Sequence, residues 1–525
     1  MSSRAATLRM DKTSQDTWEA GPEQVFVGKD VLELLSSAMY LDPLTIYREY
    51  IQNAADAIDD AVSAGLITKA HGGKVEIFLS PDAQGVDART IRIRDNGIGV
   101  SSAQFVDRLT ALGGSQKRGT NSRGFRGVGR LAGLGYCQEL VFRSKAAGEP
   151  KVSELQWDCR LLKALLRSTD SKDDLADVIQ RSVKLRRVTG EKPQDHFFEV
   201  ELRGVIRHKD DRLLNPTAVS DYLAQVAPVP FAPDFKYGAE ISTKVRQFVT
   251  GNDVDIRING SEPVYRPHRN RLQLSNGKSD PFTHVDYLEI PSIDGGVGAF
   301  AWILHHGYQG SIPAAALVKG LRFRCGNIQV GDNDILQDLF AEPRFNGWAV
   351  GVVHVLDSRV LPNGRRDHFE QTNHFNNLVG QLAPLAHDVT RKCRLFSLKR
   401  RLQRDFDLLA ERINERFVAL RRGGLSAGVR QRLTREAAAA LANMEKIAAK
   451  EQHTPAVRTR MEATIADFIA KLKRRGAQLA GDSPLAKLPL AKRKMFEQMF
   501  SLIYEHAANK TVANALITRI LERAV

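Results

Sequence analysis

The distribution of apolar residues changes near residue 390 of this 525-residue chain, and this change constrains the fold more than any other feature. Before it, short runs alternate apolar and polar residues as half-buried strands do, for example at 74–79 (KVEIFL) and 90–95 (TIRIRD). After it, strand signals stop, and apolar residues recur every three or four positions over 395–420. The sequence therefore predicts α+β domains followed by an all-α region, with a first long helix that ends at Gly423.

A proline-rich segment at 227–235 (APVPFAPDF) separates two sets of predicted strands. The first set includes 74–79, 90–95 and 197–202, alternating with predicted helices, which is typical of one sheet covered by helices. The second set is expected at 254–258, 287–290, 299–304, 321–330 and 348–355. We therefore predict a polar tail (1–20), a first α+β domain (21–235), a second α+β domain (236–388) and a helical region (389–525).

Positive charge is concentrated in the helical region. The whole chain carries 76 Lys and Arg against 61 Asp and Glu, a formal charge of +15. Residues 391–525 hold 29 basic and 13 acidic residues, so the preceding 390 residues are close to neutral. Such asymmetry indicates an acidic partner, either nucleic acid or protein, or else an unusually basic solvated surface.

Several classes of protein are disfavoured. The chain has no run of about 18 uncharged apolar residues, so no membrane span is expected. The N-terminal residues lack the apolar core of a signal peptide, which favours a cytoplasmic protein. Four widely spaced cysteines argue against a disulfide framework or a zinc ribbon. His305 and His306 follow an apolar strand with no further ligands nearby in the sequence, which favours a core or turn position over a metal site.

The first chemically suggestive motif is YREYIQNAADA at 47–57, within a predicted helix over 45–64. Glu49 and Asn53 are four residues apart, so they share one face of that helix. A carboxylate there could accept a proton from an attacking water, and an amide oxygen could complete the ligand shell of Mg²⁺. Taken alone, such a pair is more typical of a solvated helix face.

The second motif, DNGIG at 95–99, comes directly after a predicted strand. Asp95 at the strand end could hydrogen-bond the edge of a buried ligand, and Gly97 and Gly99 would let the backbone approach that ligand closely. An ordinary turn is an equally good interpretation of this motif alone, because Asp-Asn-Gly is also favourable turn chemistry.

The third motif is the glycine-rich run Gly124-Phe-Arg-Gly127-Val-Gly129, followed by an apolar helix start. Glycine-rich backbone leading into a helix N-terminus suits phosphates. It is not a Walker loop, since Phe125 stands where lysine is required, and its spacing does not fit a dinucleotide fingerprint. A flexible surface loop is the alternative for these glycines taken singly.

Together, the order and spacing of the three motifs resemble the GHKL ATPase superfamily, which includes gyrase, the ninety-kilodalton heat-shock chaperones, histidine kinases and MutL. The resemblance implies that ATP binds over an α/β sandwich in the first domain. It also implies that Asp95 reads the adenine amino group, that Asn53 is a ligand of Mg²⁺, and that Glu49 activates water. Asp56, on the same helix, is assigned with Asn53 to the cofactor site.

The resemblance assigns further residues to the nucleotide. Gly97 and Gly99 would shape the adenine pocket, while Gly124, Gly127 and Gly129 would wrap the phosphates as the hinge of a lid. Ser115 and Lys117 stand where lid residues of the chaperone and MutL branches approach the nucleotide. One element departs from the pattern. Relatives often carry Gly-Thr before a late strand, whereas the candidate strand here begins with His196 and has no threonine.

The second domain resembles the middle, transducer-like domain of the heat-shock chaperones. There, a strand ends in a Leu-Pro turn, and an arginine after it reaches the γ-phosphate. In this chain Leu361-Pro362 is followed by Arg366, with Arg365 as the alternative if the register shifts by one. Such an arginine would stabilise charge on the transferred phosphoryl group. An exposed basic turn is the competing interpretation.

The resemblance thus implies an ATP-hydrolysing conformational clamp similar to the heat-shock protein 90 chaperones, acting on an unnamed client as a homodimer. The alternative is a GHKL ATPase closer to MutL or the MORC proteins, in a nucleic-acid-handling or defence system, with 391–525 binding nucleic acid or a partner. A nucleotide-binding scaffold without turnover is disfavoured by Glu49.

Overall fold

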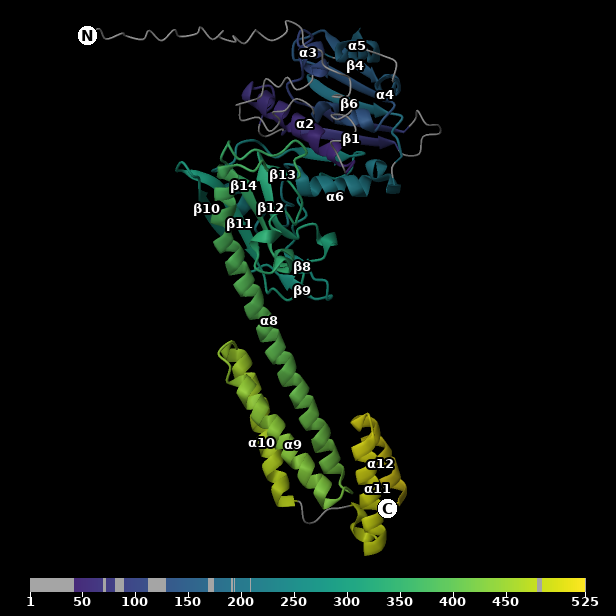
Figure 1. The fold of residues 1–525 in the computed structure, drawn as a ribbon, viewed down its shortest axis with the longest axis vertical. Coiled ribbons are helices and arrows are strands. Elements are labelled where there is room, and N and C mark those ends of the chain that lie inside the picture. The colour runs from purple at the N-terminus through teal and green to yellow at the C-terminus, as the bar shows by residue number, and fades with distance from the viewer. Residues whose placement is uncertain are drawn as a thin grey trace, which may run out of the picture.

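The computed structural model describes residues 42–68, 72–80, 89–111, 129–168, 174–189, 192, 194–207, 209–478 and 484–524. These residues form two α+β units, each built on its own sheet, and a long helical extension (Figure 1). The fold class predicted from the sequence is therefore confirmed. The expected tail at 1–20 lies outside the described residues.

The first unit contains a seven-stranded sheet with the strand order β5-β4-β3-β6-β2-β1-β7. Neighbouring strands are antiparallel except for β1 and β7, which are parallel. The strands are β1 (Lys74–Ser80), β2 (Thr90–Asp95), β3 (Glu139–Lys145), β4 (Lys151–Asp158), β5 (Val183–Thr189), β6 (Phe197–Arg203) and β7 (Asp255–Ile258). The helices of this unit are α2 (Thr45–Ser63), α3 (Phe105–Thr110), α4 (Cys159–Arg167), α5 (Leu175–Ser182) and α6 (Pro216–Val226).

The two faces of this sheet differ in chemistry. Side chains from one face join those of α2, α4, α5 and α6 in a single apolar core, among them Ile58, Ile77, Leu162, Val178 and Leu223. The other face carries ion pairs that cross the strands. Arg143 of β3 contacts Glu199 of β6 at 3.1 Å and Glu154 of β4 at 2.9 Å. This is the two-layer sandwich expected when a sheet buries one face and exposes the other to water.

The second unit contains a five-stranded sheet with the order β10-β11-β14-β12-β13 and a separate hairpin of β8 and β9. Its strands are β8 (Arg271–Gln273), β9 (Ser279–Pro281), β10 (His284–Pro291), β11 (Val297–His305), β12 (Gly320–Cys325), β13 (Ile328–Val330) and β14 (Val350–Val355). Helix α7 (Gly238–Val245) precedes them. The predicted strand at 321–330 is a hairpin, because the backbone turns at Asn327, which has a left-handed φ of 63°.

One strand lies in a different sheet from the one predicted. The strand expected at 254–258 was assigned to the second domain, but β7 pairs with β1 and extends the first sheet. Its register places Lys74 opposite Asp255 and Ile77 opposite Ile258. The apolar residues of β7 are thereby buried in the core of the first unit. The chain therefore returns to the first sheet after α7, well beyond the proline-rich segment.

Helix α8 (Asn373–Arg422) is a single helix of 50 residues, roughly 75 Å long at 1.5 Å per residue. Its first turns bury Phe375, Leu382 and Val389 against the second sheet, and the helix then continues without a break through the boundary expected at 388/389. It ends at Gly423, as predicted, where the backbone takes a positive φ of 76°.

The remaining helices pack along the distal half of α8 and with it form what we call the helical arm (Figure 1). They are α9 (Ala427–Ala448), α10 (Pro455–Gln478), α11 (Leu490–His506) and α12 (Lys510–Ala524). Phe406 and Phe417 of α8 pack with Met444 of α9 and Phe468 of α10. A second core near the end of α8 joins α9, α11 and α12.

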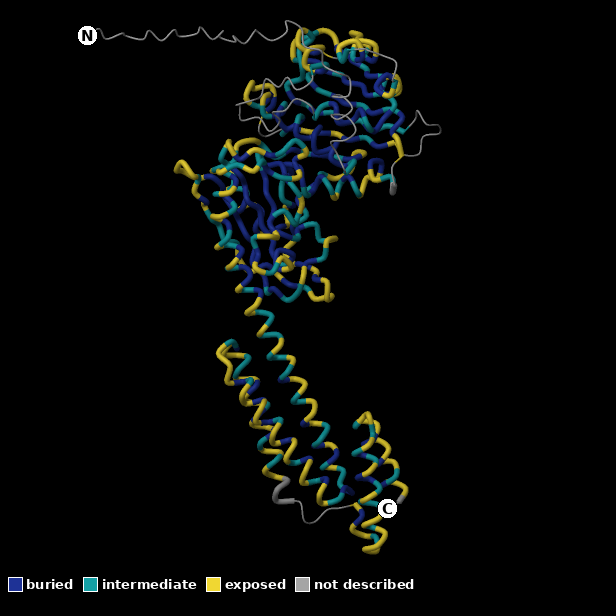
Figure 2. The backbone as a smooth tube through the Cα atoms, in the orientation of Figure 1, coloured by how far each residue is buried: buried dark blue, intermediate teal, exposed yellow. Residues whose placement is uncertain are grey.

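Buried residues are concentrated in the two α+β units, and the helical arm is mostly exposed (Figure 2). Across the part of the chain that the structure describes, no helix combines the length and apolar character needed to cross a membrane.

Candidate active site

Helix α2 holds the residues of the first motif. Its apolar face, including Ile51 and Ile58, is buried in the core, and this fixes the orientation of the helix on the sheet. Glu49 and Asp56 are buried, with 7% and 5% of their surfaces exposed, while Asn53 is half-buried. Buried carboxylates are rare unless they have partners, so α2 places unusual chemistry inside the first unit.

The DNGIG motif lies against α2. The Ile98 N–H donates to the Ala57 carbonyl of that helix at 2.9 Å. Asp95, at the end of β2, accepts from the Gly97 N–H at 2.8 Å. Gly99 has a φ of +72°, and a Cβ there would come within 2.2 Å of the Lys145 carbonyl oxygen, so only glycine fits.

Asp95 is in an unusual electrostatic environment. Its carboxyl group is buried, and this burial raises its pKa to about 7, against the opposing effect of the backbone N–H groups of Gly97 and Phe198. A cavity of about 670 Å³ borders this strand end, but it is lined mainly from the exposed face of the sheet, by Lys74, Glu76 and Arg94, whereas Asp95 shares the buried face with Ile91 and Ile93. A buried carboxyl group with a raised pKa is a candidate functional residue.

Gly129 is the residue of the third motif that the structure describes. It begins a short 3-10 helix, Gly129–Gly135, beside α2. A Cβ on Gly129 would come within 2.3 Å of Glu49 Oε2. The glycine-rich backbone thus touches the carboxylate of the first motif. Ser115, Lys117, Gly124 and Gly127, which we assigned to the lid, lie outside the described residues.

A loop of the second unit reaches this carboxylate. It connects β14 to α8 and closes through a bridge between Pro362 and Phe369. Arg366 lies at its turn with a φ of +56°, and its Nε is 3.7 Å from Glu49 Oε1. It is Arg366, and not Arg365, whose guanidinium approaches Glu49. Both side chains of this pair are about nine-tenths buried.

Arg48 is part of the same cluster and was missed by the sequence analysis. Its Nη2 lies 3.3 Å from Glu49 Oε1 and also donates to the Arg365 carbonyl at 2.9 Å. Its Nη1 donates to the Arg366 carbonyl at 3.4 Å. Arg48 therefore holds the loop of the second unit against α2. Adjacent helix residues do not normally face one another, so the spacing gave no signal for it.

His196 was not assigned to the site from the sequence either, although the strand that begins there was noted to lack the expected threonine. It immediately precedes β6, and its Nδ1 lies 2.7 Å from the Gly97 carbonyl oxygen. His196 thus fixes the backbone that follows Asp95. The absence of the expected threonine was the signal that could have identified this residue.

Sheet, helix and motifs together define the class of this domain. Residues 47–177 match the family described as histidine kinase-, DNA gyrase B- and HSP90-like ATPase. The first unit thus carries a GHKL-type ATPase domain, and the resemblance stated from the motifs is confirmed.

Part of the chain is also similar to a curated chaperone protein. The chaperone protein HtpG of Verminephrobacter eiseniae (strain EF01-2) is 30% identical over 142 residues, which cover 24% of this chain and 21% of the relative. The chain is therefore similar to a heat-shock protein 90 type protein over about a fifth of that protein's length.

Proposed function

We propose that this protein binds and hydrolyses ATP and uses the reaction to drive a conformational clamp, as the resemblance to heat-shock protein 90 type chaperones implies. One observation carries the proposal. Glu49 and Arg366 come from different α+β units, and their side chains lie 3.7 Å apart. A site completed by a residue from a second unit can couple the chemistry to the arrangement of the two units.

In this proposal Glu49 is the general base. Its carboxylate accepts a proton from the water that attacks the γ-phosphorus, and the products are ADP and phosphate. Gly129 supports this role, because its backbone passes so close to Glu49 that no side chain fits between them. Backbone N–H groups of a glycine-rich segment that leads into a helix can bind phosphate, so this segment brings a phosphate-binding element next to the base.

Arg366 stabilises the negative charge that spreads over the transferred phosphoryl group. Arg48 positions it, because Arg48 donates to the backbone carbonyls of both Arg365 and Arg366. The loop carrying Arg366 and the N-terminal half of α2 border a cleft of about 750 Å³, which also exposes Arg212 and Asp338. Such a cleft gives the loop space to move when the two units change their arrangement.

Asp95 is assigned to the adenine amino group, and His196 to the position of the missing threonine contact. The 2.7 Å contact from His196 to the Gly97 carbonyl supports the second assignment. Asn53, one turn beyond Glu49 on α2, offers the hard amide oxygen that Mg²⁺ prefers, and the carboxylates of Glu49 and Asp56 lie on the same helix. These residues fit a magnesium ion, which when bound would neutralise phosphate charge.

An ATPase assay on the purified full chain tests the proposal. We expect magnesium-dependent phosphate release from the wild type, and retained ATP binding without turnover in Glu49→Ala. Asp95→Ala should weaken ATP binding by about 10- to 100-fold, as for the loss of a hydrogen bond to a charged group. Full turnover in either variant would refute the site assignment.

A second candidate function rests on the basic residues of the helical arm. Lys446, Lys473 and Lys494, on α9, α10 and α11, are exposed to solvent. A GHKL ATPase of the MutL or MORC type could bind nucleic-acid phosphates through such a surface, and the affinity would then fall steeply with salt.

The structure indicates where to truncate the chain to test this function. Cys393 is buried in the core of the second unit, and Phe396 packs against that core, so deletion from 391 would damage it. A chain ending at residue 404 keeps those contacts. Binding of the full chain to random-sequence DNA at low salt, lost in the truncated chain, would support nucleic-acid handling. No binding at low salt would exclude it.

A further inference from the structure

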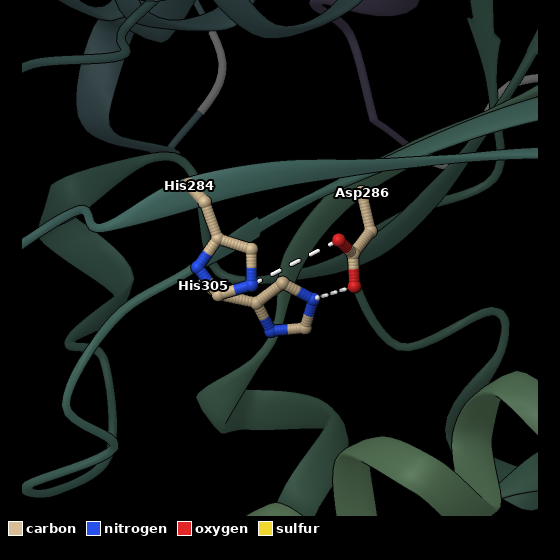
Figure 3. A group of neighbouring side chains, drawn as sticks. All are labelled: His284, Asp286 and His305. Atoms are coloured by element: carbon tan, nitrogen blue, oxygen red, sulfur yellow. Dashed lines mark ion pairs between the residues drawn. The ribbon is translucent and has the colours of Figure 1, made fainter.

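Three potential metal-ligating side chains meet at the edge of the second sheet (Figure 3). His284 and Asp286 are two residues apart on the edge strand β10, so they point to the same side of the sheet. The antiparallel register places His305, the last residue of β11, directly opposite His284. One ligand atom from each residue lies within 4.8 Å of the other two. His305 has no further metal-ligating partners close to it in the sequence. The pairing of β10 with β11 brings His284 and Asp286 next to it in the fold.

His305 is fixed in the orientation that a metal ligand needs. Its side chain is 4% exposed, and its Nδ1 lies 2.6 Å from the Tyr308 hydroxyl. Its Nε2 faces Asp286 Oδ2 at 2.9 Å. In protein metal sites one ring nitrogen of a histidine coordinates the ion while the other is held by a hydrogen bond, and here the Tyr308 hydroxyl holds Nδ1.

We propose that His284, Asp286 and His305 bind a divalent transition-metal ion, with zinc as the reference ion. Two imidazole nitrogens and one carboxylate form a donor set that suits zinc, nickel or ferrous iron, and not calcium or magnesium. Three protein ligands leave a further coordination position open to water or a small ligand. His284 is 56% and Asp286 47% exposed, so the ion reaches the site directly from solvent.

Binding requires no net loss of a proton from His305. In the tautomer that we assign to the metal-free protein, Nε2–H donates to Asp286 and Nδ1 accepts from the Tyr308 hydroxyl. When Nε2 coordinates the ion, the ring proton resides on Nδ1 and is donated to the Tyr308 oxygen. Tyr308 is buried, so it holds the ring in both states.

Lys392 of α8 is the competing cation. Its Nζ lies 3.7 Å from Asp286 Oδ2 and 3.4 Å from His305 Nε2, so it partly neutralises the carboxylate. It also has a second partner, Asp388, at 3.0 Å on the same helix. An entering metal ion therefore displaces Lys392 toward Asp388. Occupancy of the site thus changes a contact between the sheet and α8 in the region where this helix packs on the second unit.

Calorimetric titration of the full-length, nucleotide-free chain with Zn²⁺ tests the site. We expect the wild type to bind one equivalent that His284→Ala and Asp286→Asn lose or bind at least tenfold more weakly. His374→Ala is the matched control, because His374 forms a comparable pair with Asp357, at 3.2 Å, outside the cluster. Equal zinc stoichiometry and affinity in all four proteins, or no zinc binding by the wild type at millimolar concentration, would overturn the proposal.

Two further variants separate metal binding from a purely structural cluster. Tyr308→Phe keeps the ring and removes only the hydroxyl, so zinc affinity should fall by about 10- to 100-fold, as for other residues that orient a ligand. Lys392→Met removes the competing charge and should tighten zinc binding. Unchanged affinity in Tyr308→Phe would refute the assigned role of His305 Nε2, and weaker binding in Lys392→Met would refute the displacement of the lysine. Neither readout depends on ATPase activity.

Discussion

Arg366 Nε lies 3.7 Å from Glu49 Oε1, so an arginine of the second α+β unit pairs with a carboxylate inside the first. Arg48, adjacent to Glu49 on α2, approaches the same carboxylate oxygen at 3.3 Å. The guanidinium groups of Arg48 and Arg366 thus face one buried carboxylate. The group of Arg366 contacts it only when the two units are correctly arranged. Because the pair crosses between units, its removal should affect turnover far more than nucleotide binding.

Arg366→Ala should therefore lower the rate of ATP hydrolysis by about 10³-fold, the lower end of the range for arginine fingers. The affinity for ATP should change little, since the base and the Asp95 site remain in the first unit. Steady-state phosphate release and calorimetric nucleotide binding measure the two effects separately.

Arg365→Ala is the matched control for this prediction. Arg365 is exposed, and its backbone carbonyl, which accepts from Arg48, is unchanged by the substitution. Its turnover should stay within a few-fold of the wild type. A larger loss in Arg365→Ala than in Arg366→Ala would show that the register of the arginine assignment is shifted by one.

Glu49→Gln should abolish most turnover and leave ATP bound. The amide keeps the shape of the side chain and its contacts with Arg48 and Arg366, but it cannot accept the proton of an attacking water. General bases contribute about 10²–10⁴-fold, so the rate should fall within that range. Hydrolysis at the wild-type rate with normal ATP affinity would mean that another group is the base.

The buried Asp95 predicts a dependence of stability on pH. Its pKa is about 7 in the folded, ATP-free protein and about 4 in an unfolded chain. Between these values the folded state keeps a proton that the unfolded state releases. Its contribution to stability is therefore present below about pH 4 and is lost as the pH rises to about 7, by at most about 1.4 kcal/mol per pH unit.

Asp95→Asn isolates this contribution, because asparagine does not titrate and its carbonyl can still accept from the Gly97 N–H. We expect the melting temperature of the wild type, relative to that of Asp95→Asn, to fall between pH 5 and pH 7. Thermal unfolding followed by circular dichroism at several pH values measures the difference. A constant difference across this range would contradict the raised pKa of Asp95.

Gly129→Ala tests the close approach of the glycine-rich backbone to Glu49. The added Cβ would lie 2.3 Å from Glu49 Oε2, so the carboxylate or the backbone must move. A displacement of about 1 Å in a reacting group can cost about 10²-fold in rate, and we expect a loss of that order. Gly380→Ala on α8, where a Cβ meets nothing within 4 Å, should hydrolyse ATP normally.

Local pattern predicted most elements, because helix and strand periodicities are properties of neighbouring residues. The helix expected at 45–64 is α2, and the strands at 74–79 and 90–95 are β1 and β2. The pattern could not place β7 in its sheet, since its alternating DIRI sequence fits any half-buried strand. Its parallel pairing with β1 depends on where the chain returns after α7, which only the tertiary fold decides.

The same limit applies to the side-chain clusters. The position of Glu49 on a helix was predictable, because its motif is continuous on α2. Arg48 was not, since it acts through its contact with a loop more than 300 residues away in the sequence. His284, Asp286 and His305 meet through the register of two antiparallel strands, which sequence spacing does not reveal.

The exposed apolar residues of α11 and α12 predict a homodimer through the end of the helical arm. Leu502 and Val512 are 57% and 62% exposed, and Met495 and Leu516 lie one to two turns from them with 59% and 47% exposed. Burial of such residues stabilises association, so Leu502→Arg combined with Val512→Arg should convert dimers to monomers in sedimentation experiments. Ile293→Arg, at a similarly exposed apolar residue of the second unit (51%), should remain dimeric. If the wild type, the double variant and Ile293→Arg were all dimeric, the interface would lie elsewhere.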